Sequence, residues 1–564
     1  MNSSKTKWIP NTESCGLILI LMLGIYFRWT NLWTRGFIYG DGVVHWKAVI
    51  DAMTEGVYHW YHAKPGHMFL LWVYAKLFGL KNFVPMAVSF TTGLLCIGIV
   101  FLIGRLIYSS RAGLFAATLI SISPWHVYYS RTTGATGNAV SFWILALFLY
   151  LLSHPKWSKE NNSSKPSDEE HDYRSLFLLI LSGFSMGFAF SCHYNLGLLP
   201  FIFFMFEIAL IVKIKFDHQS QDPYLPPIKL FFWKKVLPKN ALRIFILFSA
   251  MLFPLAIFNF SHIYLRYTEV FEVPYDPLKN DVVFSYFQQI IIQLISSTTA
   301  IWGHVSDFSF WIKVIWNNEG APVFIIFLMG TIFGIIQIFS KFKFSHISTI
   351  LPVIVVFIFL INSKYTGQAR SFALAIPLIA LISGNFLAEF LKNYRINAWF
   401  GCIPLIALIF NFPLLLSQSQ ISNQELEIKQ YMAEEKLNSI VVQGKPMYAL
   451  AYKTVEALQL SQNIEWTQKQ VQNARKEKLI ISPSLLLARF KQSDITNHYR
   501  CRPLVQWPRL IGSSSMKFEQ GQTDRNWDLK PRPDLNQIIG IFPLNICFSG
   551  EKNKITQKSK LNQK

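Results

Sequence analysis

The chain alternates between long, continuous apolar blocks and shorter polar connections. Blocks such as LPVIVVFIFLI have the character of a membrane helix, which needs about 20 apolar residues to cross a hydrocarbon core of roughly 30 Å. Hydropathy predicts about eleven spans, near residues 14–33, 84–108, 112–128, 137–153, 174–192, 195–213, 242–262, 321–340, 347–362, 371–391 and 398–417. The predicted fold class is mainly α: a polytopic bundle of transmembrane helices.

Basic residues in the connections predict the orientation of this bundle. Lys and Arg are retained on the cytoplasmic side, and they concentrate in every second connection, as in KIKFDHQSQDPYLPPIKLFFWKKVLPKNALR. Residues 34–83 and 263–320 and the tail after 417 fall on the opposite side. We therefore expect these three regions to face away from the cytoplasm.

Composition agrees with a membrane protein and changes how the charge is interpreted. Hydrophobic residues make up 52% of the 564 residues, charged residues only 15%, and the formal net charge is +21. Because much of this charge lies beside the ends of spans, it fits topology and contact with anionic lipid headgroups. A nucleic-acid partner is not predicted, since a binder concentrates its charge on one soluble face.

The tail differs from the rest of the chain. Segments such as NSIVVQG, KTVEALQLSQ and KLIISPSLLLARF predict a small α/β domain. The predicted organisation is a membrane domain over 1–417, an outer α/β domain over 418–550 and a disordered basic tail over 551–564. An oxidising compartment allows Cys501 and Cys547 to form a disulfide, although sequence cannot supply the geometry.

The first outer loop is the richest place for chemistry. Its sequence GFIYGDGVVHWKAVIDAMTEGVYHWYHAKPGHMF combines Asp41, several histidines, lysines and aromatic residues. The part VVHWKAVIDAMTEG has helical spacing with one apolar side, which predicts an amphipathic helix in the interface. The carboxylate of Asp41, between two glycines, could serve as a general base that takes a proton from an attacking hydroxyl or amine.

Cations that could stabilise a phosphate leaving group stand in three outer loops. Lys64 lies in the first, Arg131 ends SPWHVYYSR in the second, and Arg370 lies in SKYTGQARSF. A lysine binds phosphate as a point charge and an arginine as a bidentate fork. Taken singly, such a residue is more often a solvated charge or an interfacial anchor. Together, on one face, they predict a site for an anionic ligand.

Histidines raise the question of a metal. His45, His59, His62 and His67 lack the tight spacing of a zinc site, so no metal site is predicted, and a divalent ion stays open as an alternative. His45, His62 and Tyr365 are candidates for accessory roles in the site.

Ordered motifs carry a resemblance to a known family. HAKPGHMFLLWVYAKLFG, after Asp41, is similar to a His/Lys-Pro-Pro stretch that leads to a Leu-Phe-Gly turn, and a Ser-Pro-x-x-x-x-x-Ser-Arg element ends at Arg131. ARSFALAIPLIALIS is similar to a late Arg-Tyr-x-x-x-x-x-Pro segment. On these motifs, residues 15–155 resemble the polyprenyl-phosphate-dependent glycosyltransferases of the C superfamily, such as protein O-mannosyltransferases and the lipid A aminoarabinose transferase.

The resemblance implies a membrane-embedded cavity that opens outward, a lipid-phosphate sugar as donor, and inverting transfer to a protein, lipid or glycan acceptor. It implies that Asp41 is the catalytic carboxylate, that Lys64 and Arg131 contact the donor phosphate, and that Arg370 is a late-loop contact. The sequence departs from the family at Gly42, where an acidic residue is common, and at Gly66, where a second proline is common.

Localisation and the competing functions follow from these expectations. The chain is expected in a membrane, and a bacterial inner membrane with the site on the periplasmic side fits it, the endoplasmic reticulum being the alternative. A transporter or flippase of lipid-linked sugars would place polar residues along several mid-span faces and use broken helices. A non-catalytic scaffold has no need of phosphate-binding cations beside a carboxylate. Neither the sugar nor the acceptor can be predicted.

Overall fold

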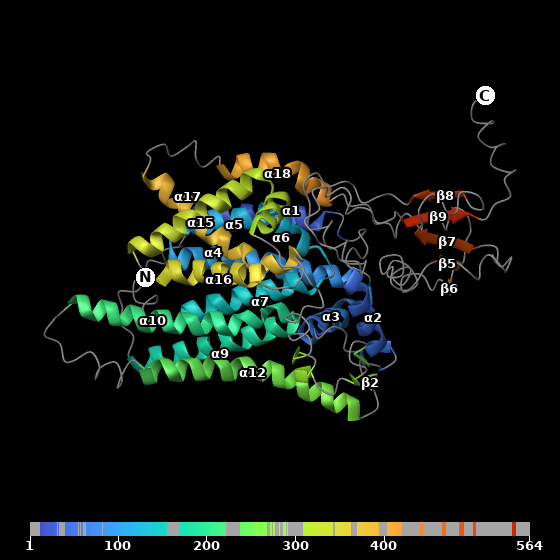
Figure 1. Cartoon of the computed structure of the whole chain (residues 1–564), viewed down its shortest axis with the longest axis horizontal. Helices are drawn as coiled ribbons and strands as arrows, with labels where there is room; N and C mark the ends of the chain where they lie inside the picture. Colours follow the sequence, from blue (N-terminus) through green and yellow to red (C-terminus); the bar gives the residue numbers. More distant parts are fainter. Residues whose placement is uncertain are drawn as a thin grey trace, which may run out of the picture.

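A bundle of long helices forms most of the molecule (Figure 1). The computed structural model describes residues 12–30, 40–54, 64–81, 83–132, 134–154, 168–221, 237–267, 308–341, 344–362, 369–393 and 403–419, a few short pieces between them, and five strands after residue 438. Within these residues the protein is mainly helical, as the hydrophobic pattern predicts.

A helix lies over each of the predicted spans. These helices are α1 (Thr12–Trp29), α4 (Val84–Ile107), α5 (Ser110–Ile122), α7 (Ala135–Leu152), α9 (Asp168–Cys192), α10 (Leu199–Gln221), α12 (Leu237–Tyr267), α15 (Ala321–Lys341), α16 (Phe344–Asn362), α17 (Ile376–Asn393) and α18 (Ile403–Ser419). Between them lie α2 (Gly40–Thr54), α3 (Pro65–Phe78), α6 (Pro124–Tyr129), α14 (Phe308–Glu319) and the 3₁₀ segments η1 (Tyr194–Leu198) and η4 (Ala369–Leu374).

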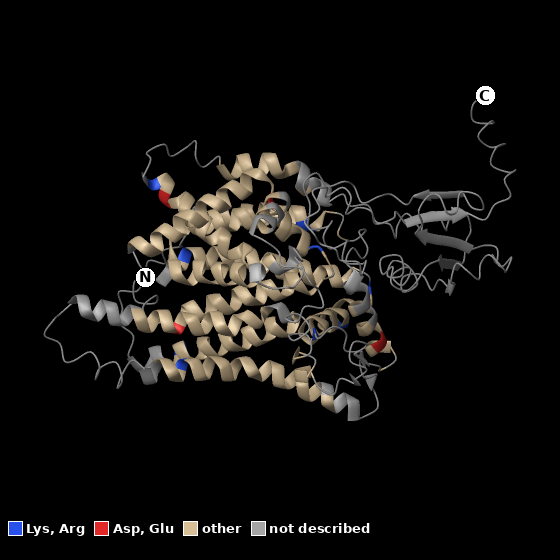
Figure 2. Ribbon diagram, viewed as in Figure 1, with Lys and Arg blue, Asp and Glu red and all other residues tan. Residues whose placement is uncertain are grey.

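Six helices among the described residues are long and apolar enough to cross a membrane, namely those within α4, α7, α9, α12, α15 and α17. Four further apolar helices, within α5, α10, α16 and α18, are shorter. A membrane-spanning bundle is therefore supported, while the count of eleven stays a prediction. Figure 2 shows that charged residues are sparse along the middle of the helices and gather near their ends.

One predicted span is divided. The prediction ran continuously over 112–128, but α5 ends at Ile122 and α6 begins at Pro124. Ser123 separates them, with its backbone extended and its hydroxyl accepting a hydrogen bond from the His126 N–H, while Pro124 occupies the first turn of α6. Serine as the N-cap and proline in the first helical turn are the residues that start a new helix.

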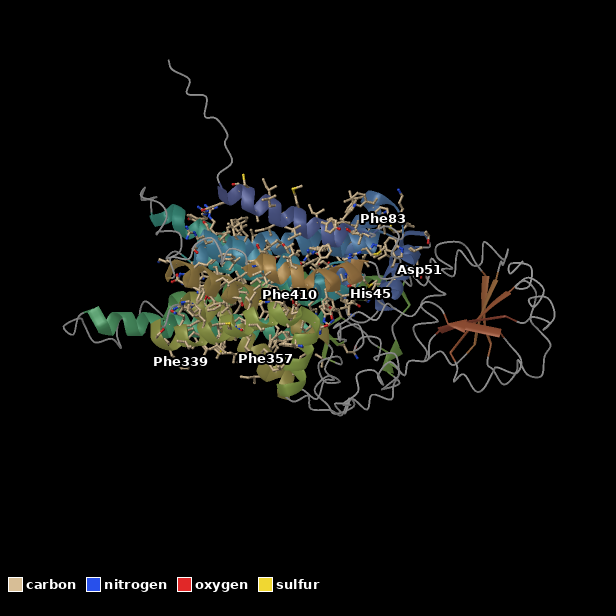
Figure 3. All side chains as sticks on the ribbon, turned by 90° about the horizontal axis from the view of Figure 1, so that it is seen from above. His45, Asp51, Phe83, Phe339, Phe357 and Phe410 are labelled. Carbon is tan, nitrogen blue, oxygen red and sulfur yellow. The ribbon has the colours of Figure 1, made fainter. Side chains whose placement is uncertain are left out.

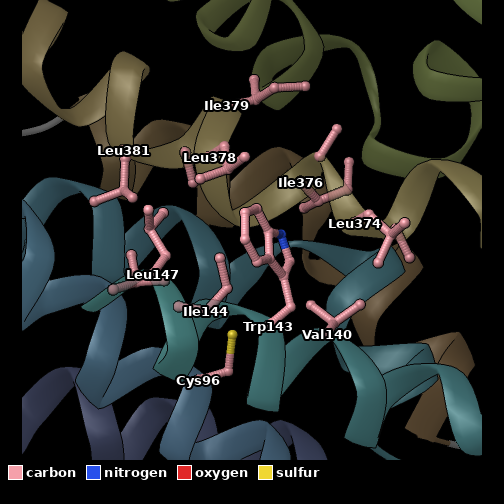
Figure 4. Close-up of a cluster of buried hydrophobic side chains, with 14 of the residues drawn as sticks. Cys96, Val140, Trp143, Ile144, Leu147, Leu374, Ile376, Leu378, Ile379 and Leu381 are labelled. Carbon is pink, nitrogen blue, oxygen red and sulfur yellow. The ribbon is translucent and has the colours of Figure 1, made fainter. Parts of the chain in front are cut away.

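Helices approach closely where small residues line them. A Cβ atom added to Gly183 or Gly187 of α9 would lie 2.3 Å and 2.1 Å from the carbonyl oxygens of Leu247 and Met251 in α12. This is the small-xxx-small pattern by which membrane helices bring their backbones together. At the centre, side chains of α4, α7, η4 and α17 interlock, including Trp143, Ile144 and Leu378 (Figure 4).

Strands in the tail form one mixed sheet of five. Their order is β6-β5-β7-β9-β8, built from β5 (Ser439–Gln443), β6 (Glu465–Lys469), β7 (Ser484–Arg489), β8 (Arg500–Pro503) and β9 (Leu544–Phe548). β5 pairs in parallel with β6 and β7, whereas β9 is antiparallel to β7 and β8. The predicted tail helix KTVEALQLSQ and the basic end after 550 lie outside the described residues, so the α/β assignment and the domain boundaries stay predictions.

Short strands accompany two of the loops that are predicted to be outer. β1 (Tyr58–His59) pairs in parallel with β2 (Phe271–Glu272), so the first outer loop meets the long loop after α12. β3 (Tyr275–Asp276) and β4 (Asp281–Val282) form an antiparallel pair beside them in sequence. In Figure 1, α2, α3 and β2 lie together at one end of the bundle.

Candidate active site

Two helices of the first outer loop form one side of the candidate site. The predicted amphipathic helix is present as α2, whose His45, Trp46, Ala48 and Val49 are buried while Thr54 is exposed. Trp46 and Val49 pack in one apolar cluster with Leu71 of α3. Figure 3 shows His45 and Asp51 at one end of the bundle, with Phe339 toward the other.

α3 begins in a confined place. Lys64 is its N-cap residue and is only 3% exposed, and Pro65 occupies the first turn. A Cβ on Gly66 would lie 2.1 Å from Ser191 Oγ and 3.1 Å from the Cys192 backbone nitrogen, at the end of α9. A proline ring at position 66, which the resembled family commonly has, would therefore collide with α9.

A hydrogen-bonded chain anchors the next residue of α3. Asn138 Nδ2, in the first turn of α7, donates to His67 Nδ1 at 2.9 Å. Thr92 Oγ1, on α4, donates to Asn138 Oδ1 at 2.7 Å. The His67 ring meets the His45 ring edge to face, with centroids 5.1 Å apart and an interplanar angle of 75°. We call His45, His67, Thr92 and Asn138 the histidine cluster.

A second buried group surrounds α6, and we call Arg28, His126, Ser130 and Arg131 the arginine cluster. Arg28 is fully buried near the end of α1 and donates to His126 Nδ1 at 2.8 Å. Since the guanidinium can only donate, His126 is a neutral imidazole that accepts at Nδ1. Arg28 also donates to the carbonyl oxygens of Gly24 (3.1 Å), Ile120 (3.1 Å) and Ser121 (3.3 Å).

Arg131 is likewise fully buried, directly after α6. It donates to the carbonyl oxygens of Phe27, at 2.6 Å, and of Thr30, which lie at the end of α1. Burial lowers the pKa of the Arg131 guanidinium to about 10, so the group stays charged at neutral pH. Among the described residues, no acidic side chain contacts Arg28 or Arg131; carbonyl groups at helix C-termini, which carry partial negative charge, offset their charge.

A buried carboxyl group lies next to this cluster. Ser123 Oγ donates to Glu319 Oε1 at 2.8 Å, and Asn411 Nδ2 of α18 donates to the Glu319 carbonyl at 2.7 Å. Burial raises the pKa of the Glu319 carboxyl to about 8, although the hydrogen bond from Ser123 acts in the opposite direction. These hydrogen bonds connect the junction between α14 and α15 to the start of α6 and to α18.

η4 brings the late loop to the same place. Phe372 packs between Trp125 of α6 and Trp311 of α14, at centroid distances of 5.5 Å and 6.2 Å. Arg370 belongs to η4, two residues before Phe372, so its backbone is held beside α6. Its side chain lies outside the described residues.

The two clusters adjoin through neighbouring residues. A Cβ on Gly93, next to Thr92, would meet Ser130 Oγ at 2.3 Å, and one on Gly137, next to Asn138, would meet the Tyr129 carbonyl at 2.6 Å. The start of α3, α6 and the start of α7 therefore share one end of the bundle. Lys64, Arg131 and His45, which the sequence singled out, lie at this end of the bundle.

Other predicted site residues are only partly described. Asp41 is the second residue of α2, but its side chain, all of His62 and all of Tyr365 lie outside the described residues. The sequence analysis missed Arg28, His126 and Glu319. A charged residue inside an apolar block, as Arg28 is, was the available signal. Within the described ranges, no three His, Cys, Asp or Glu side chains converge to hold a metal ion.

Comparison with known proteins agrees with this arrangement. The chain resembles the C superfamily of polyprenyl-phosphate-dependent glycosyltransferases: residues 62–163 match the family model described as dolichyl-phosphate-mannose-protein mannosyltransferase. No curated protein sequence matches the chain.

Solved structures of two such enzymes share the fold. ArnT from Cupriavidus metallidurans bound to undecaprenyl phosphate has a TM-score of 0.51 at 11% identity, covering 87% of this chain and 96% of that one. The Archaeoglobus fulgidus oligosaccharyltransferase tethered to an acceptor peptide has a TM-score of 0.52 at 13% identity, covering 79% of this chain and 63% of that one. This chain thus spans less than two thirds of the length of the archaeal enzyme.

Proposed function

We propose that this chain is a glycosyltransferase that moves a sugar from a polyprenyl-phosphate donor to an acceptor on the non-cytoplasmic face of a membrane. One observation carries the proposal. The fold resembles enzymes of this class, and at one end of it stand a first-loop helix with Asp41 in its first turn and the buried cations Lys64 and Arg131. ArnT and the archaeal oligosaccharyltransferase have each been seen with a polyprenyl phosphate, undecaprenyl phosphate and dolichol phosphate respectively.

In the proposed reaction, Asp41 takes the proton of an acceptor hydroxyl or amine as that group attacks the sugar C1 carbon. The bond between C1 and the phosphate oxygen breaks, and the lipid phosphate leaves with the electron pair. Lys64 and Arg370 stabilise this charge directly, and Arg131 adds a fixed positive field from the arginine cluster. His62 and Tyr365 take accessory positions around the donor.

The acceptor is a protein, a lipid or a glycan, and a bacterial inner membrane with the site on the periplasmic side suits the distribution of basic residues. The tail domain, placed on the same side, would help to select the acceptor. The transporter alternative is less favoured because the key charges concentrate at one end of the bundle, and a transporter spreads them along mid-span faces.

The test is sugar transfer from a panel of radiolabelled polyprenyl-phosphate sugars in membranes, with and without a divalent metal. We expect Asp41→Asn to lower transfer by roughly 10²- to 10⁴-fold, the usual contribution of a general base. Asp51→Asn is the matched control, since Asp51 lies on the same helix and has no proposed role. Equal activity of wild type and Asp41→Asn removes Asp41 as the base. No transfer from any donor overturns the proposal, and vesicle flux of the same lipids then tests the transporter.

A further inference from the structure

Glu319 is a fully buried carboxyl group that the proposed reaction does not use. Its Oε1 accepts the hydrogen bond from Ser123 Oγ at 2.8 Å, and its Oε2 has no hydrogen-bond partner among the described residues. In the same part of the chain no cation pairs with it. A buried carboxyl group without a cation is costly, and a hydrogen bond from a serine hydroxyl does not require an ionisable acceptor. This cost indicates a role beyond the hydrogen bond itself.

The backbone at Glu319 is fixed against α18. Asn411 Nδ2 donates to the Glu319 carbonyl at 2.7 Å. Gly320, which follows, has a φ of 75°, and a Cβ there would lie 2.3 Å from Asn411 Oδ1. Glycine is the residue that adopts this backbone without strain and leaves space for the amide. The junction between α14 and α15 therefore holds the Glu319 carboxyl in one place against Ser123.

Ser123 connects this carboxyl to the arginine cluster. The same Oγ that donates to Glu319 accepts from the His126 backbone N–H at 3.1 Å and caps the start of α6. His126 Nδ1 in turn accepts from Arg28 at 2.8 Å, and α6 ends two residues before Arg131. Because Ser123 Oγ makes both contacts at once, a change at Glu319 acts directly on the first turn of α6.

We propose that Glu319 is a positioning residue for the arginine cluster, a role that rests on the proposed function. Through Ser123 it holds the start of α6, and it thereby keeps Arg131 in place for the donor phosphate. The neutral carboxyl group makes this hydrogen bond without adding charge to a site that binds an anion. Neither a covalent step nor a further reactant is involved.

Ionisation of Glu319 should work against donor binding. Burial raises the pKa of the Glu319 carboxyl to about 8, so the group is neutral at pH 7 and loses its proton as the pH rises through this value. The carboxylate is then a buried charge without a partner, which disfavours the closed junction. Its negative charge also lowers the positive potential at this end of the bundle. Both effects raise the donor KM at high pH.

Other titratable or charged residues lie on the elements around Glu319. They are Arg28 on α1, His126, Tyr128 and Tyr129 on α6, Arg131 after α6, Lys313 on α14 and Arg370 on η4. The side chains of Lys313 and Arg370 lie outside the described residues. α18 carries no titratable residue, and α5 and α15 carry theirs at their far ends, Arg111 and Lys341. A comparison of Glu with Gln at position 319 leaves all these groups in place.

The test measures donor KM from pH 6 to 9 in membranes that contain the wild type, Glu319→Gln or Glu319→Leu. The donor phosphate is a diester, whose single charge does not change in this range. The wild-type donor KM should rise roughly 3- to 10-fold between pH 7 and 9, with little change in acceptor KM. Glutamine keeps an acceptor oxygen for Ser123 and cannot ionise, so its donor KM should stay near the wild-type value of pH 7 throughout.

Leucine removes the acceptor oxygen and the ionisable group together. At pH 7, Glu319→Leu should raise the donor KM roughly 3- to 10-fold, because the Ser123 hydroxyl loses its partner and the start of α6 shifts. This higher KM should not change with pH. A residue with only a structural role would lower the amount of folded protein and leave the donor KM of the folded fraction unchanged.

Glu389→Gln is the matched control, since it makes the same substitution in the last turns of α17, far from η4 at the start of that helix. Its donor KM should follow the wild type at every pH. The same pH dependence in the wild type and Glu319→Gln overturns this inference, as does an unchanged donor KM in Glu319→Leu, and both results leave the proposed function standing. If the leucine variant does not fold, the glutamine comparison decides. No transfer by the wild type overturns the proposed function and this inference with it.

Discussion

The two ends of α7 hold buried charge in different ways. At its last turn, Arg243 of α12 pairs with Glu207 of α10 at 3.2 Å, and Tyr150 Oη donates to the same carboxylate oxygen at 3.1 Å. Arg243 also donates to Ser153 Oγ at 3.2 Å. We call these four residues the paired cluster. At the other end of α7, roughly 20 Å away at 1.5 Å per residue, lies the arginine cluster, whose cations contact carbonyl oxygens and a neutral histidine.

From this difference we infer that the paired cluster has a structural role and that the arginine cluster serves the proposed function. A buried ion pair ties three helices together and cancels its own field, so it offers nothing to a ligand. Two buried guanidiniums, whose full charges are only partly offset by carbonyl dipoles and which have no described acidic partner, keep a positive potential in a region of low dielectric. In the proposed function, this charge faces an anion, the lipid phosphate of the donor.

The largest effect is expected from breaking the paired cluster. Arg243→Met or Glu207→Leu alone leaves a buried charge without its partner and should cost about 3–5 kcal/mol of unfolding free energy. The double variant should regain most of that loss, because no charge is left unpaired. Thermal unfolding in detergent measures the three variants. If the losses of unfolding free energy in the two single variants add up in the double variant, the two residues do not act as a pair. If sugar transfer per folded molecule also falls, the paired cluster is not purely structural.

Substitution of Arg131 should lower the unfolding free energy by a smaller amount and should separately weaken donor binding. Arg131→Met removes its hydrogen bonds to the end of α1 and should cost about 1.5–3 kcal/mol, and it should raise the donor KM. Arg131→Lys keeps the charge without the fork, so it should lose stability while retaining most donor affinity. Arg111→Met, at an exposed position near the other end of α5, is the control. Equal donor KM in Met and Lys variants would leave Arg131 a purely structural residue.

Glu319, next to the arginine cluster, should make the unfolding free energy depend on pH. Its carboxyl pKa is raised by burial from 4.5 to about 8, so between these values the folded protein binds more protons than the unfolded chain. Unfolding free energy should therefore fall as pH rises through this window, by roughly 1 kcal/mol per pH unit, and level off above it. Glu319→Gln should flatten the dependence, as followed by thermal midpoints from pH 5 to 9. The same slope in both proteins would assign it to other groups.

Much of the fold could be predicted because hydropathy is a property of single segments. The apolar blocks predicted the long helices, and the period of VVHWKAVIDAMTEG predicted α2. The clusters could not be predicted, because His67 and Asn138 stand 71 residues apart and only the packing of α3 on α7 brings them into contact. Arg28 and Glu319 were missed for the same reason. Arg28 is one polar residue in an apolar stretch and Glu319 ends the polar run NNE. The role of each depends on which carbonyl or hydroxyl group it contacts.

The smallest effect on the bundle is expected from a cysteine substitution in the tail. The state of the two tail cysteines nevertheless reports which end of α7 faces outward. Cys501 and Cys547 are directly opposite each other in the antiparallel register of β8 and β9. Opposite residues have Cα atoms about 4.5–5.5 Å apart, within the roughly 4.4–6.8 Å that a disulfide spans. On an oxidising side we expect the bond to form, so that mass spectrometry of the unreduced protein finds the two peptides joined and Cys501→Ser separates them, with transfer unchanged.

Maleimide labelling of intact cells is the companion measurement, with Cys192 as the control because it is buried in the bundle and should label only after denaturation. A bonded pair resists the reagent until it is reduced, and a Cys501→Ser variant exposes Cys547 to an impermeant reagent. If both thiols are free and react only with a permeant reagent, the tail faces the cytoplasm. Because ten of the eleven predicted spans separate the first outer loop from the tail, the prediction puts both on one side, and the first outer loop would then face inward as well. The arginine cluster would lie at the cytoplasmic end, and the proposed site would have to take its donor from that side.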